Sequence, residues 1–567
     1  MLKKFQKIPS RYFLVSLVVM ACVGALLMGS GRYLAKKLLS AYRLAPSLVV
    51  QDRNKQEICV LPNSRGNYAR KIETIPPLFT KLLIQKEDQY FYYHFGINPV
   101  SLVRSIFGYL NSGQRKAGST ISQQLVKILM GHEMQRTLKN KFIELFYTLA
   151  LEISKSKKEI LNQYVNSIFF GHQAQGVEEA SRKYFGLGSE LLNQGQILQL
   201  LATISSPNEN NPGQERNIFQ AKALAQRLSI ALKEDDLVNP ETVRENMQKY
   251  THLQDACFEL IPLLSTPAHR SLGEGGEGLG EVGIFGVTLS SSLTQTIRAI
   301  VQENLLAWRE KDARQAAVVV LKLPENEVLA LIGSPDPSSE EPGNKINMAL
   351  EPRAIGSTIK PFIYLKAFEK NLRPYTLVDD REYKYITALG FPLYPKNYDL
   401  KYRGAVTLHY SLSNSLNVPA VKVLEYVGLG DFYGFLQNDL GFTPIQPLKN
   451  YQLGIALGAL EMNLLDLAHY FTLFPNQGAL RDLQLLQKSD FSSGSTEPPA
   501  GGVVSLREIS QSETIPSLAN KRQIAAPQYV RLVNKILSDR QTGMEQFGMK
   551  SELNLFQNNY ALKTGTS

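Results

Sequence analysis

A glycine-rich segment divides the chain into two parts of different character. Residues 273–286 (GEGGEGLGEVGIFG) supply too few apolar side chains to bury a core, which is typical of a flexible joint. Residues 45–235 carry apolar residues at helical spacing, as in KFIELFYTLALEI at 141–153. Residues 315–333 (QAAVVVLKLPENEVLALIG) are two β-rich runs around a Pro-Glu-Asn turn, which predicts a hairpin. Since 567 residues also exceed one ordinary core, we predict two main domains.

An uncharged apolar run near the start predicts a membrane anchor. Residues 13–29 (FLVSLVVMACVGALLMG) have about the length needed to cross a bilayer, and only basic charges precede them. We expect a cytoplasmic tail at 1–11, a transmembrane helix at 12–31 and the remainder outside the cytoplasm. Basic residues also follow the run. A cleaved signal peptide is the alternative, although no Ala-x-Ala stands near the end of the run.

The net charge restricts the class of binding partner. A net charge of +11 indicates an anionic partner. We do not expect nucleic acid, because the sequence has no basic helix, zinc-ligand spacing or RNA-binding aromatic motif. Anionic lipid and a pyrophosphate-bearing substrate fit better.

Cys22 lies in the apolar run, so Cys59 and Cys257 are the one pair that could form a disulfide; free buried thiols are the favoured alternative.

Three short motifs in the second half predict an acylation site. They are STIK at 357–360, SLN at 415–417 and KTG at 563–565. A serine is a poor nucleophile without a base beside it, and Lys360 stands one helical turn after Ser357. A second serine with an amide, and a Lys-Thr-Gly strand, would supply a proton relay and a substrate-binding edge. The arrangement resembles that of penicillin-recognising acyl transferases.

The residues around Ser357 predict its place in a helix. Pro361 is tolerated only in a first helical turn, so Ser357 is expected at a helix N-terminus. Free backbone N–H groups there favour developing negative charge.

Four motifs in the first half predict a second site. They are EDQYFYYHFG (87–96), AGSTISQQLVK (117–127), RTLKNKFIE (136–144) and KKEILNQYVNSIFFGHQAQGVEEASRKYFG (157–186). Transfer of a sugar from a pyrophosphate needs a carboxylate base and cations that assist the leaving phosphates. Glu87 is the candidate base and Glu144 a second carboxylate. Lys127, Arg136 and Lys141 are candidates for phosphate binding.

Each of these motifs alone has a structural alternative. The acids Glu87 and Asp88 could form a solvated helix end. Lys141 and Glu144 could be a helix ion pair. Residues 119–120 (Ser-Thr) could be a helix N-cap. The order of the four motifs favours the functional interpretation.

Taken together, the first half resembles the peptidoglycan glycosyltransferase domain (family 51) and the second half the transpeptidase domain of class A bifunctional penicillin-binding proteins. The resemblance covers residues 45–567. It implies an all-α, lysozyme-like glycosyltransferase domain at 45–235, a linker at 236–286 and an α+β penicillin-binding/serine β-lactamase-like transpeptidase domain at 287–567. The apolar stretch 100–110 would touch lipid, or else form a buried core helix.

The family implies polymerisation of lipid II into β-1,4 glycan strands, usually with a divalent metal (Mg²⁺ or Mn²⁺). In the resemblance, Glu87 matches the base for the sugar 4-hydroxyl and Glu144 the carboxylate near the pyrophosphate. The chain departs from the family pattern at Ala117, Asn140 and Asn162, which leaves the grip on the pyrophosphate in question. The matched substrate-binding positions are Ser119, Gln123, Gln124, Lys127, Arg136 and Lys141.

The second half implies cross-linking of stem peptides through an acyl-enzyme. Ser357 matches the nucleophile, which β-lactams would acylate, and Lys360 matches its base. The remaining matched positions are Ser415 and Asn417 between the lysine and the substrate, Lys563, Thr564 and Gly565 at the substrate carboxylate, and Thr566, whose N–H joins that of Ser357 in the oxyanion hole.

The resemblance places the protein in the inner membrane of a bacterium, with its catalytic domains on the periplasmic side. The implied partners are lipid II, nascent glycan, stem peptides, β-lactams, the membrane and other cell-wall synthesis proteins. In the family, further strands follow the Lys-Thr-Gly strand, so we expect a transpeptidase domain that is incomplete at its C-terminus. The alternative is a glycosyltransferase whose inactive or truncated penicillin-binding domain acts as a scaffold. A β-lactam sensor would need a signalling domain, and a serine β-lactamase would not need residues 45–235.

Overall fold

The chain forms two compact units in a computed structural model. One comprises Met1–Val49 with Cys59–Gln254, and the other comprises Val50–Ile58 with Asp255–Ser567. The structure describes residues 29–30, 32–33, 46–63, 65–98, 119–131, 138–252, 255–264, 284–386, 392–487, 521–548, 551, 553–557 and 559–566.

The expected tail and transmembrane helix (1–31) and the apolar stretch 100–110 lie outside these residues, except for the last positions of the helix. Among the described residues, no helix has both the length and the apolar character that a membrane crossing requires. The transmembrane helix therefore stays a prediction.

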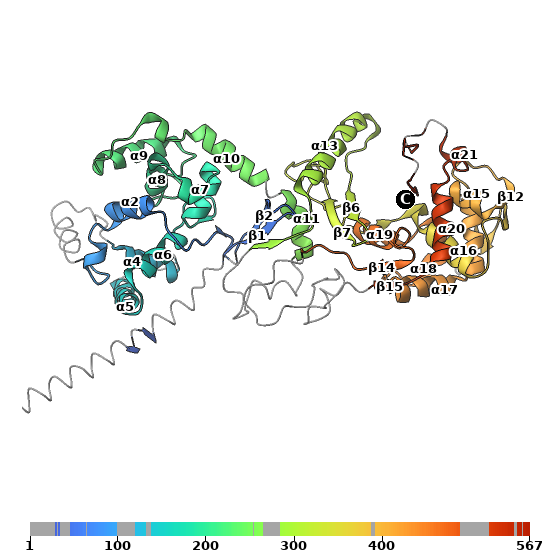
Figure 1. The fold of residues 1–567 in the computed structure, drawn as a ribbon, viewed down its shortest axis with the longest axis horizontal. Helices are drawn as coiled ribbons and strands as arrows, with labels where there is room; N and C mark the ends of the chain where they lie inside the picture. Colours follow the sequence, from blue (N-terminus) through green and yellow to red (C-terminus); the bar gives the residue numbers. More distant parts are fainter. Residues whose placement is uncertain are drawn as a thin grey trace, which may run out of the picture. The chain divides into compact units, whose positions relative to one another are not determined.

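The first unit is mainly helical. Helix α4 packs against both α5 and α6, and these helices lie together in Figure 1. Side-chain caps fix where α4, α6 and α8 begin, since Thr120, Ser156 and Asn193 each form a capping box. The helices are α2 (Pro77–Glu87), α4 (Ile121–Leu129), α5 (Leu138–Ser154), α6 (Lys157–Ser167), α7 (Val177–Phe185), α8 (Gln194–Thr203), α9 (Glu215–Arg227) and α10 (Pro240–His252), with 3₁₀ turns η1 (Phe91–Tyr93), η2 (Ser189–Leu191) and η3 (Glu234–Asp236).

The helix predicted at 141–153 is confirmed as α5. The expectation of an all-α domain holds only in the main, because β3 (Tyr68–Ala69) and β4 (Ala174–Gln175) form a short parallel pair. Strands β1 (Leu48–Gln51) and β2 (Glu57–Leu61), where the chain passes between the units, form with β5 (Ile284–Gly286) a sheet of order β2-β1-β5.

The segment expected as a linker, 236–286, holds ordered helices at its start. Helix α10 packs against α7, and Asn246 donates to the Tyr184 carbonyl at 3.2 Å, so the first unit continues past residue 235. Helix α11 (Asp255–Leu264) belongs to the second unit, where Glu259 pairs with Arg298 at 2.8 Å. Apolar and polar contacts dock these helices. Residues 273–283 of the predicted glycine-rich joint lie outside the described residues, so the joint stays a prediction.

Cys59 and Cys257 are both disulfide-bonded. The favoured expectation of free buried thiols is therefore wrong, and the disulfide alternative holds. Low cysteine count is a statistical guide to redox state, and it does not report which cysteines the fold brings together.

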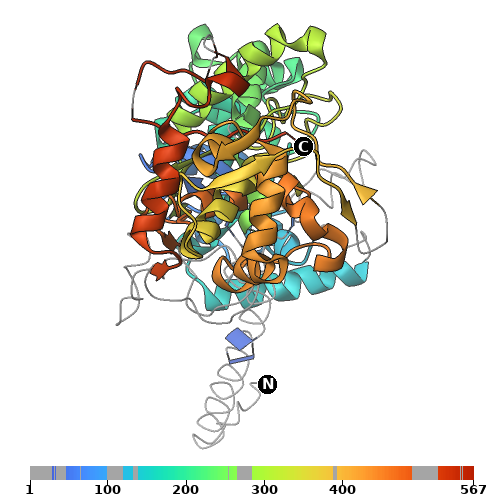
Figure 2. The same ribbon diagram turned by 90° about the vertical axis from the view of Figure 1, so that its right-hand side faces the viewer.

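The second unit is built around α14 (Lys360–Glu369), an apolar helix that contacts α15, α16 and α20. Its side chains from Phe362 to Phe368 are almost all inaccessible to solvent. The red helix α20 lies alongside this core in both ribbon views (Figures 1 and 2). The remaining helices are α13 (Ser291–Ala307), α15 (Leu408–Ser413), α16 (Asn417–Val427), α17 (Leu429–Gly434), α18 (Leu448–Tyr451), α19 (Leu464–Phe471), α20 (Pro527–Ser538) and α21 (Met544–Phe547), with turns η4 (Arg309–Lys311), η5 (Gly356–Ile359), η6 (Phe435–Asp439) and η7 (Gln452–Leu457).

The hairpin predicted at 315–333 is confirmed: β6 and β7 pair antiparallel, with Val318 opposite Ile332. Strand β9 pairs with β12, and β8 with β13. The α+β expectation is thus met by helices with short strand pairs. The strands are β6 (Val318–Lys322), β7 (Glu327–Ile332), β8 (Arg353–Ala354), β9 (Leu377–Asp380), β10 (Tyr385–Ile386), β11 (Pro392–Leu393), β12 (Gly404–Thr407), β13 (Glu461–Met462), β14 (Ala479–Arg481) and β15 (Lys521–Gln523).

The Lys-Thr-Gly segment differs from expectation. Residues 559–566 form neither helix nor strand, and among the described residues their backbone bond to other elements runs from Leu562 N to Leu537 O at 3.1 Å. A β-strand requires regular backbone hydrogen bonds to a neighbouring strand, and the sequence motif alone does not supply that neighbour.

Candidate active sites

Glu87 is held in place by residues of two helices. It is the last residue of α2, and its side chain is largely buried and ion-paired with Lys86. Gln124, on α4, donates from Nε2 to Glu87 Oε2 at 2.9 Å. Tyr164, on α6, donates from its hydroxyl to Gln124 Oε1 at 2.5 Å. The candidate base therefore ends a hydrogen-bonded chain that three helices build.

Tyr164 is buried at the far end of this chain. Burial, with the nearby Glu87 carboxylate as a smaller cause, raises the pKa of Tyr164 well above its ordinary value. The phenol thus stays a hydrogen donor, which fixes the Gln124 amide with its nitrogen toward Glu87. Sequence reasoning missed Tyr164, because it falls on the apolar face of a helical pattern.

The Ser-Thr-x-x-Gln motif serves the start of α4. Thr120 is the N-cap, and Gln123 Oε1 accepts from Thr120 N at 3.0 Å. Gln123 is almost wholly buried, so its side chain faces the cap rather than an open site. Ser119 immediately precedes this cap. The N-cap alternative describes Thr120 and Gln123, while Gln124 points to Glu87.

Lys141 and Glu144 form the helix ion pair that the sequence left open. Lys141 Nζ and Glu144 Oε1 lie 2.5 Å apart on α5, and the Lys141 side chain is half exposed. Lys127, on α4, is also exposed. Arg136 lies outside the described residues. Since α4 packs on α5, Lys127, Lys141 and Glu144 come from neighbouring helices.

One stripe of α5 is apolar and open to solvent. Phe142, Phe146, Leu149 and Ile153 are 73%, 56%, 42% and 41% exposed. Their spacing places them along one side of the helix. Such a contiguous exposed apolar surface marks a contact with lipid or with another macromolecule.

The first two motifs of the second half meet at Lys360. Ser357 lies in η5, which runs directly into α14, and Pro361 stands in the first turn of α14 as expected. Lys360 is fully buried; its Nζ donates to Ser415 O and to Asn417 Oδ1, both at 2.7 Å. The positive φ of Ser415, 54°, turns its carbonyl toward this lysine. The structure thus brings the first two motifs together.

Lys563 completes the cluster. Its Nζ donates to Ser415 Oγ at 2.8 Å, and Lys360 Nζ is 3.5 Å from the same hydroxyl. Burial lowers the pKa of Lys563 to about 7. Burial, and then the charge of Lys563, lower the pKa of Lys360 well below its ordinary value. A lysine that is neutral near physiological pH can act as a base.

Backbone packing leaves room only for glycine beside Ser357. A Cβ on Gly458 would lie 1.9 Å from Gly356 O, and a Cβ on Gly356 would lie 2.3 Å from Thr566 O. A Cβ on Gly565 would lie 2.8 Å from Ile355 O. Residues 565–566 therefore run against the turn that carries Ser357.

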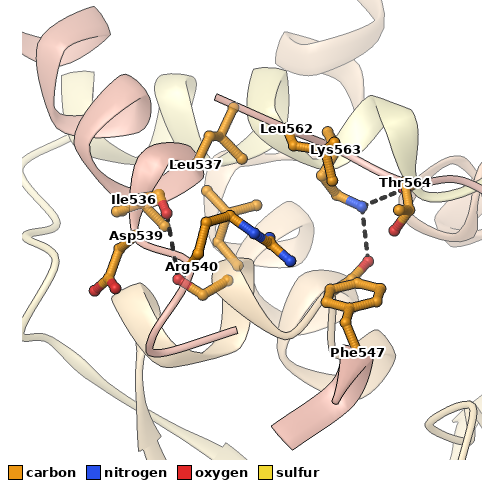
Figure 3. Close-up of a pocket in the computed structure, with 11 residues that line it drawn as sticks. Ile536, Leu537, Asp539, Arg540, Phe547, Leu562, Lys563 and Thr564 are labelled. Carbon is orange, nitrogen blue, oxygen red and sulfur yellow. Dashed lines mark hydrogen bonds between the residues drawn. The ribbon is translucent and has the colours of Figure 1, made fainter. Parts of the chain in front are cut away.

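A small pocket adjoins Ser415 and Lys563 (Figure 3). Lys563 points between Thr564 and the Ser415 hydroxyl, and the Arg540 side chain lies near the ring of Phe547. Thr564 thus lines the same pocket as Ser415 and Lys563.

In the described part of the first half, we find no evident ligand set for the expected divalent metal. Within the described ranges, no group of three His, Cys, Asp or Glu side chains is placed to hold a metal ion. The Glu87 carboxylate is already engaged by Lys86 and Gln124.

Two family models match the chain. Residues 54–234 match the "Transglycosylase" model, and residues 316–567 match the "Penicillin binding protein transpeptidase domain". These ranges contain both candidate sites.

Several curated proteins are similar over most of the chain. Penicillin-binding protein 1A/1B of Bacillus subtilis is 28% identical over 79% of this chain and 49% of its own length. Penicillin-binding proteins 1B of Haemophilus influenzae and 1C of Escherichia coli are each 28% identical, over 78% and 79% of this chain and 56% of their own lengths. The chain thus spans about half the length of these relatives. Penicillin-binding protein 1C is thus one similar relative among several of equal identity.

The fold also matches a solved structure. Penicillin-binding protein 1A from Haemophilus influenzae superposes with a TM-score of 0.53, covering 88% of this chain and 80% of that one at 15% identity. At this identity the likeness concerns the fold alone.

Proposed function

Because the chain belongs to the class A penicillin-binding proteins, with a transglycosylase domain followed by a penicillin-binding transpeptidase domain, we propose that it is a bifunctional peptidoglycan synthase. It polymerises lipid II into β-1,4 glycan strands and cross-links the stem peptides. The observation that carries the proposal is the meeting of three separate motifs at Lys360, Ser415 and Lys563.

We propose that the lone pair of a neutral Lys360 serves Ser357. A neutral amine has two N–H donors and one lone pair. Both donors are taken, by Ser415 O and by Asn417 Oδ1. The lone pair then accepts the proton of the Ser357 hydroxyl as its oxygen attacks the D-Ala-D-Ala carbonyl.

The remaining steps follow from the neighbouring groups. The N–H groups of Ser357 and Thr566 stabilise the tetrahedral oxyanion. As the C–N bond breaks, the leaving amine takes a proton through Ser415 Oγ, which Lys563 holds at 2.8 Å. An acceptor amine then attacks the acyl-enzyme ester; Lys360 takes the proton that this amine loses and returns it to the Ser357 oxygen as the ester bond breaks and the cross-link forms.

In the first domain, Glu87 acts as the base for the acceptor sugar hydroxyl. Gln124 and Lys86 fix its carboxylate, and Tyr164 fixes Gln124. Lys127, Lys141 and Arg136 bind the pyrophosphate, with Glu144 beside Lys141. Mg²⁺ or Mn²⁺ would assist the leaving pyrophosphate when bound.

We further propose that the protein works at the outer face of the bacterial inner membrane. The apolar stripe of α5, Phe142 to Ile153, supports a lipid contact, and the exposed Lys139 and Lys141 on the same helix fit anionic headgroups. The uncharged run 13–29 would anchor the chain.

The test pairs two substitutions that separate the two activities. Glu87→Gln should abolish lipid II polymerisation and leave labelling by a fluorescent penicillin intact. Ser357→Ala should do the reverse. Loss of both activities in either variant, at unchanged thermal stability, would count against two independent sites.

A second candidate function is glycosyl transfer alone, with the second domain as a scaffold. The observation in its favour is that residues 559–566 form no strand ladder in the described structure. Polymerisation without any labelling of Ser357 would support it.

A further inference from the structure

The side chain of Asn397 lies beneath the acylation site but belongs to none of the three motifs. It comes from the loop between β11 and β12 and is 2% exposed. Asn397 Oδ1 accepts from Asn417 N at 2.8 Å. We propose that Asn397, anchored by Asp380, is a positioning residue that holds Asn417 for the Lys360 base; this rests on the acylation chemistry proposed above.

Asn397 caps the helix that begins with Asn417. The N-cap residue of α16 is Leu416, which has no polar side chain to accept from the first-turn N–H groups. Asn397 supplies that oxygen from a loop twenty residues earlier in the chain. The start of α16, and with it the second motif, is therefore fixed from outside the helix.

The same loop also sets the orientation of the Asn417 amide. Asn417 Nδ2 donates to Lys396 O at 2.7 Å. A carbonyl oxygen can only accept, so the nitrogen of the amide must face Lys396. Asn417 Oδ1 is thereby turned to Lys360 Nζ at 2.7 Å, where it takes one of the two donors of the neutral amine.

Asp380 anchors Asn397 in turn. The carboxylate is fully buried at the end of β9, and both its oxygens accept from Asn397 Nδ2 at 2.9 Å. Asn397 Nδ2 also donates to Lys401 O at 2.9 Å, while Arg403 N donates to Asp380 Oδ2 at 3.0 Å. The Asn397 Nδ2 group thus donates to Asp380 and to the loop carbonyl, and its Oδ1 accepts from Asn417 N. This is a complete, directional set of bonds, which is costly to break when buried.

The experiment measures acylation of the full chain by a fluorescent penicillin, separating the noncovalent dissociation constant from the acylation rate constant. Asn397→Ala should lower the acylation rate constant roughly 10- to 100-fold, since small misplacements of a base have effects of that size. The dissociation constant should change less than about threefold, because Lys563 and Thr564 are untouched.

A polarity swap distinguishes positioning from stability. Asn397→Asp alone faces the Asp380 carboxylate with no donor, and should lose acylation. Adding Asp380→Asn restores a donor between the two positions and keeps an acceptor for Asn417 N. The double variant should therefore recover part of the rate that Asn397→Asp loses, since Lys401 O still lacks its donor.

Asn326→Ala is the matched control. Asn326 is fully buried in the same unit and donates to Thr472 Oγ1 and Arg481 O, away from the site. It should lower the melting temperature without changing the acylation rate constant of the folded protein.

The inference would be overturned if Asn397→Ala acylated with the rate constant of the parent protein. It would also be overturned if the double variant acylated no faster than Asn397→Asp. Absence of labelling in the parent chain would instead refute the proposed transpeptidase activity, and the inference with it.

Discussion

Replacement of Gly458 by alanine is expected to disable acylation at Ser357. The new Cβ would lie 1.9 Å from Gly356 O, whereas ordinary contacts begin at 3.4 Å, so the Gly356 backbone must retreat by about 1.5 Å (3.4 − 1.9). Gly356 directly precedes Ser357, and its N–H donates to Gly458 O at 3.1 Å. A shift of about 1 Å in a reacting group can reduce a rate roughly 100-fold, and we expect a loss of that order.

The backbone strain of the substitution can be separated from this displacement. Gly458 has φ +83°, and an alanine there costs roughly 1–2 kcal/mol. Gly428→Ala is the control: its φ is +92°, but its nearest contact is an ordinary 3.4 Å to Asp431. Both variants should lose stability, and only Gly458→Ala should lose labelling.

The assay is the rate of fluorescent-penicillin labelling, corrected for folded protein, beside urea unfolding of each variant. If Gly458→Ala labels at the parent rate, the contact between these two glycines does not set the position of the nucleophile, and the reasoning is refuted. Equal rate losses in both variants would trace the effect to strain alone.

Three further outcomes follow from the site contacts. Burial lowers the pKa of Lys563 to about 7, so above that pH the unfolded chain binds more protons than the folded protein. The free energy of unfolding should therefore rise by ~2 kcal/mol from pH 7 to 9. Urea unfolding of Lys563→Met should lack this rise. Tyr164→Phe removes the donor that orients Gln124 toward Glu87, and should slow lipid II polymerisation roughly tenfold while penicillin labelling is unchanged. Lys141→Ala breaks a half-exposed ion pair and should lower the free energy of unfolding by less than about 0.5 kcal/mol. If Lys141 binds pyrophosphate, the same change should slow polymerisation about tenfold or more. An unchanged polymerisation rate would mean that Lys141 serves only the ion pair with Glu144.

Local patterns in the sequence predicted local structure well. The helix at 141–153 and the hairpin at 315–333 are present because apolar periodicity and turn residues act over a few residues. Pro361 likewise placed Ser357 at the entry to α14. These features need no information from distant parts of the chain.

The roles of single polar residues were less predictable. The motif Ser-Thr-x-x-Gln fits either a substrate site or a capping box, and the structure gives Gln123 to the cap and Gln124 to Glu87. The prediction of a linker from residue 236 was wrong for α10, because the packing of α10 on α7 is a tertiary contact that the local sequence does not reveal. Asn397 carried no spacing that linked it to Asn417.

The sequence by itself determined which chemical groups the protein carries: two carboxylates and basic residues in its first half, and a serine, lysines and an amide in its second. The resemblance that the motifs carry, in their order along the chain, was enough for the domain types. Only the tertiary structure decided which of these groups meet. Burial and the neighbouring Lys563 lower the pKa of Lys360 well below its ordinary value, and Asn397 becomes a cap for α16, because burial and hydrogen-bond partners come from segments far apart in the chain.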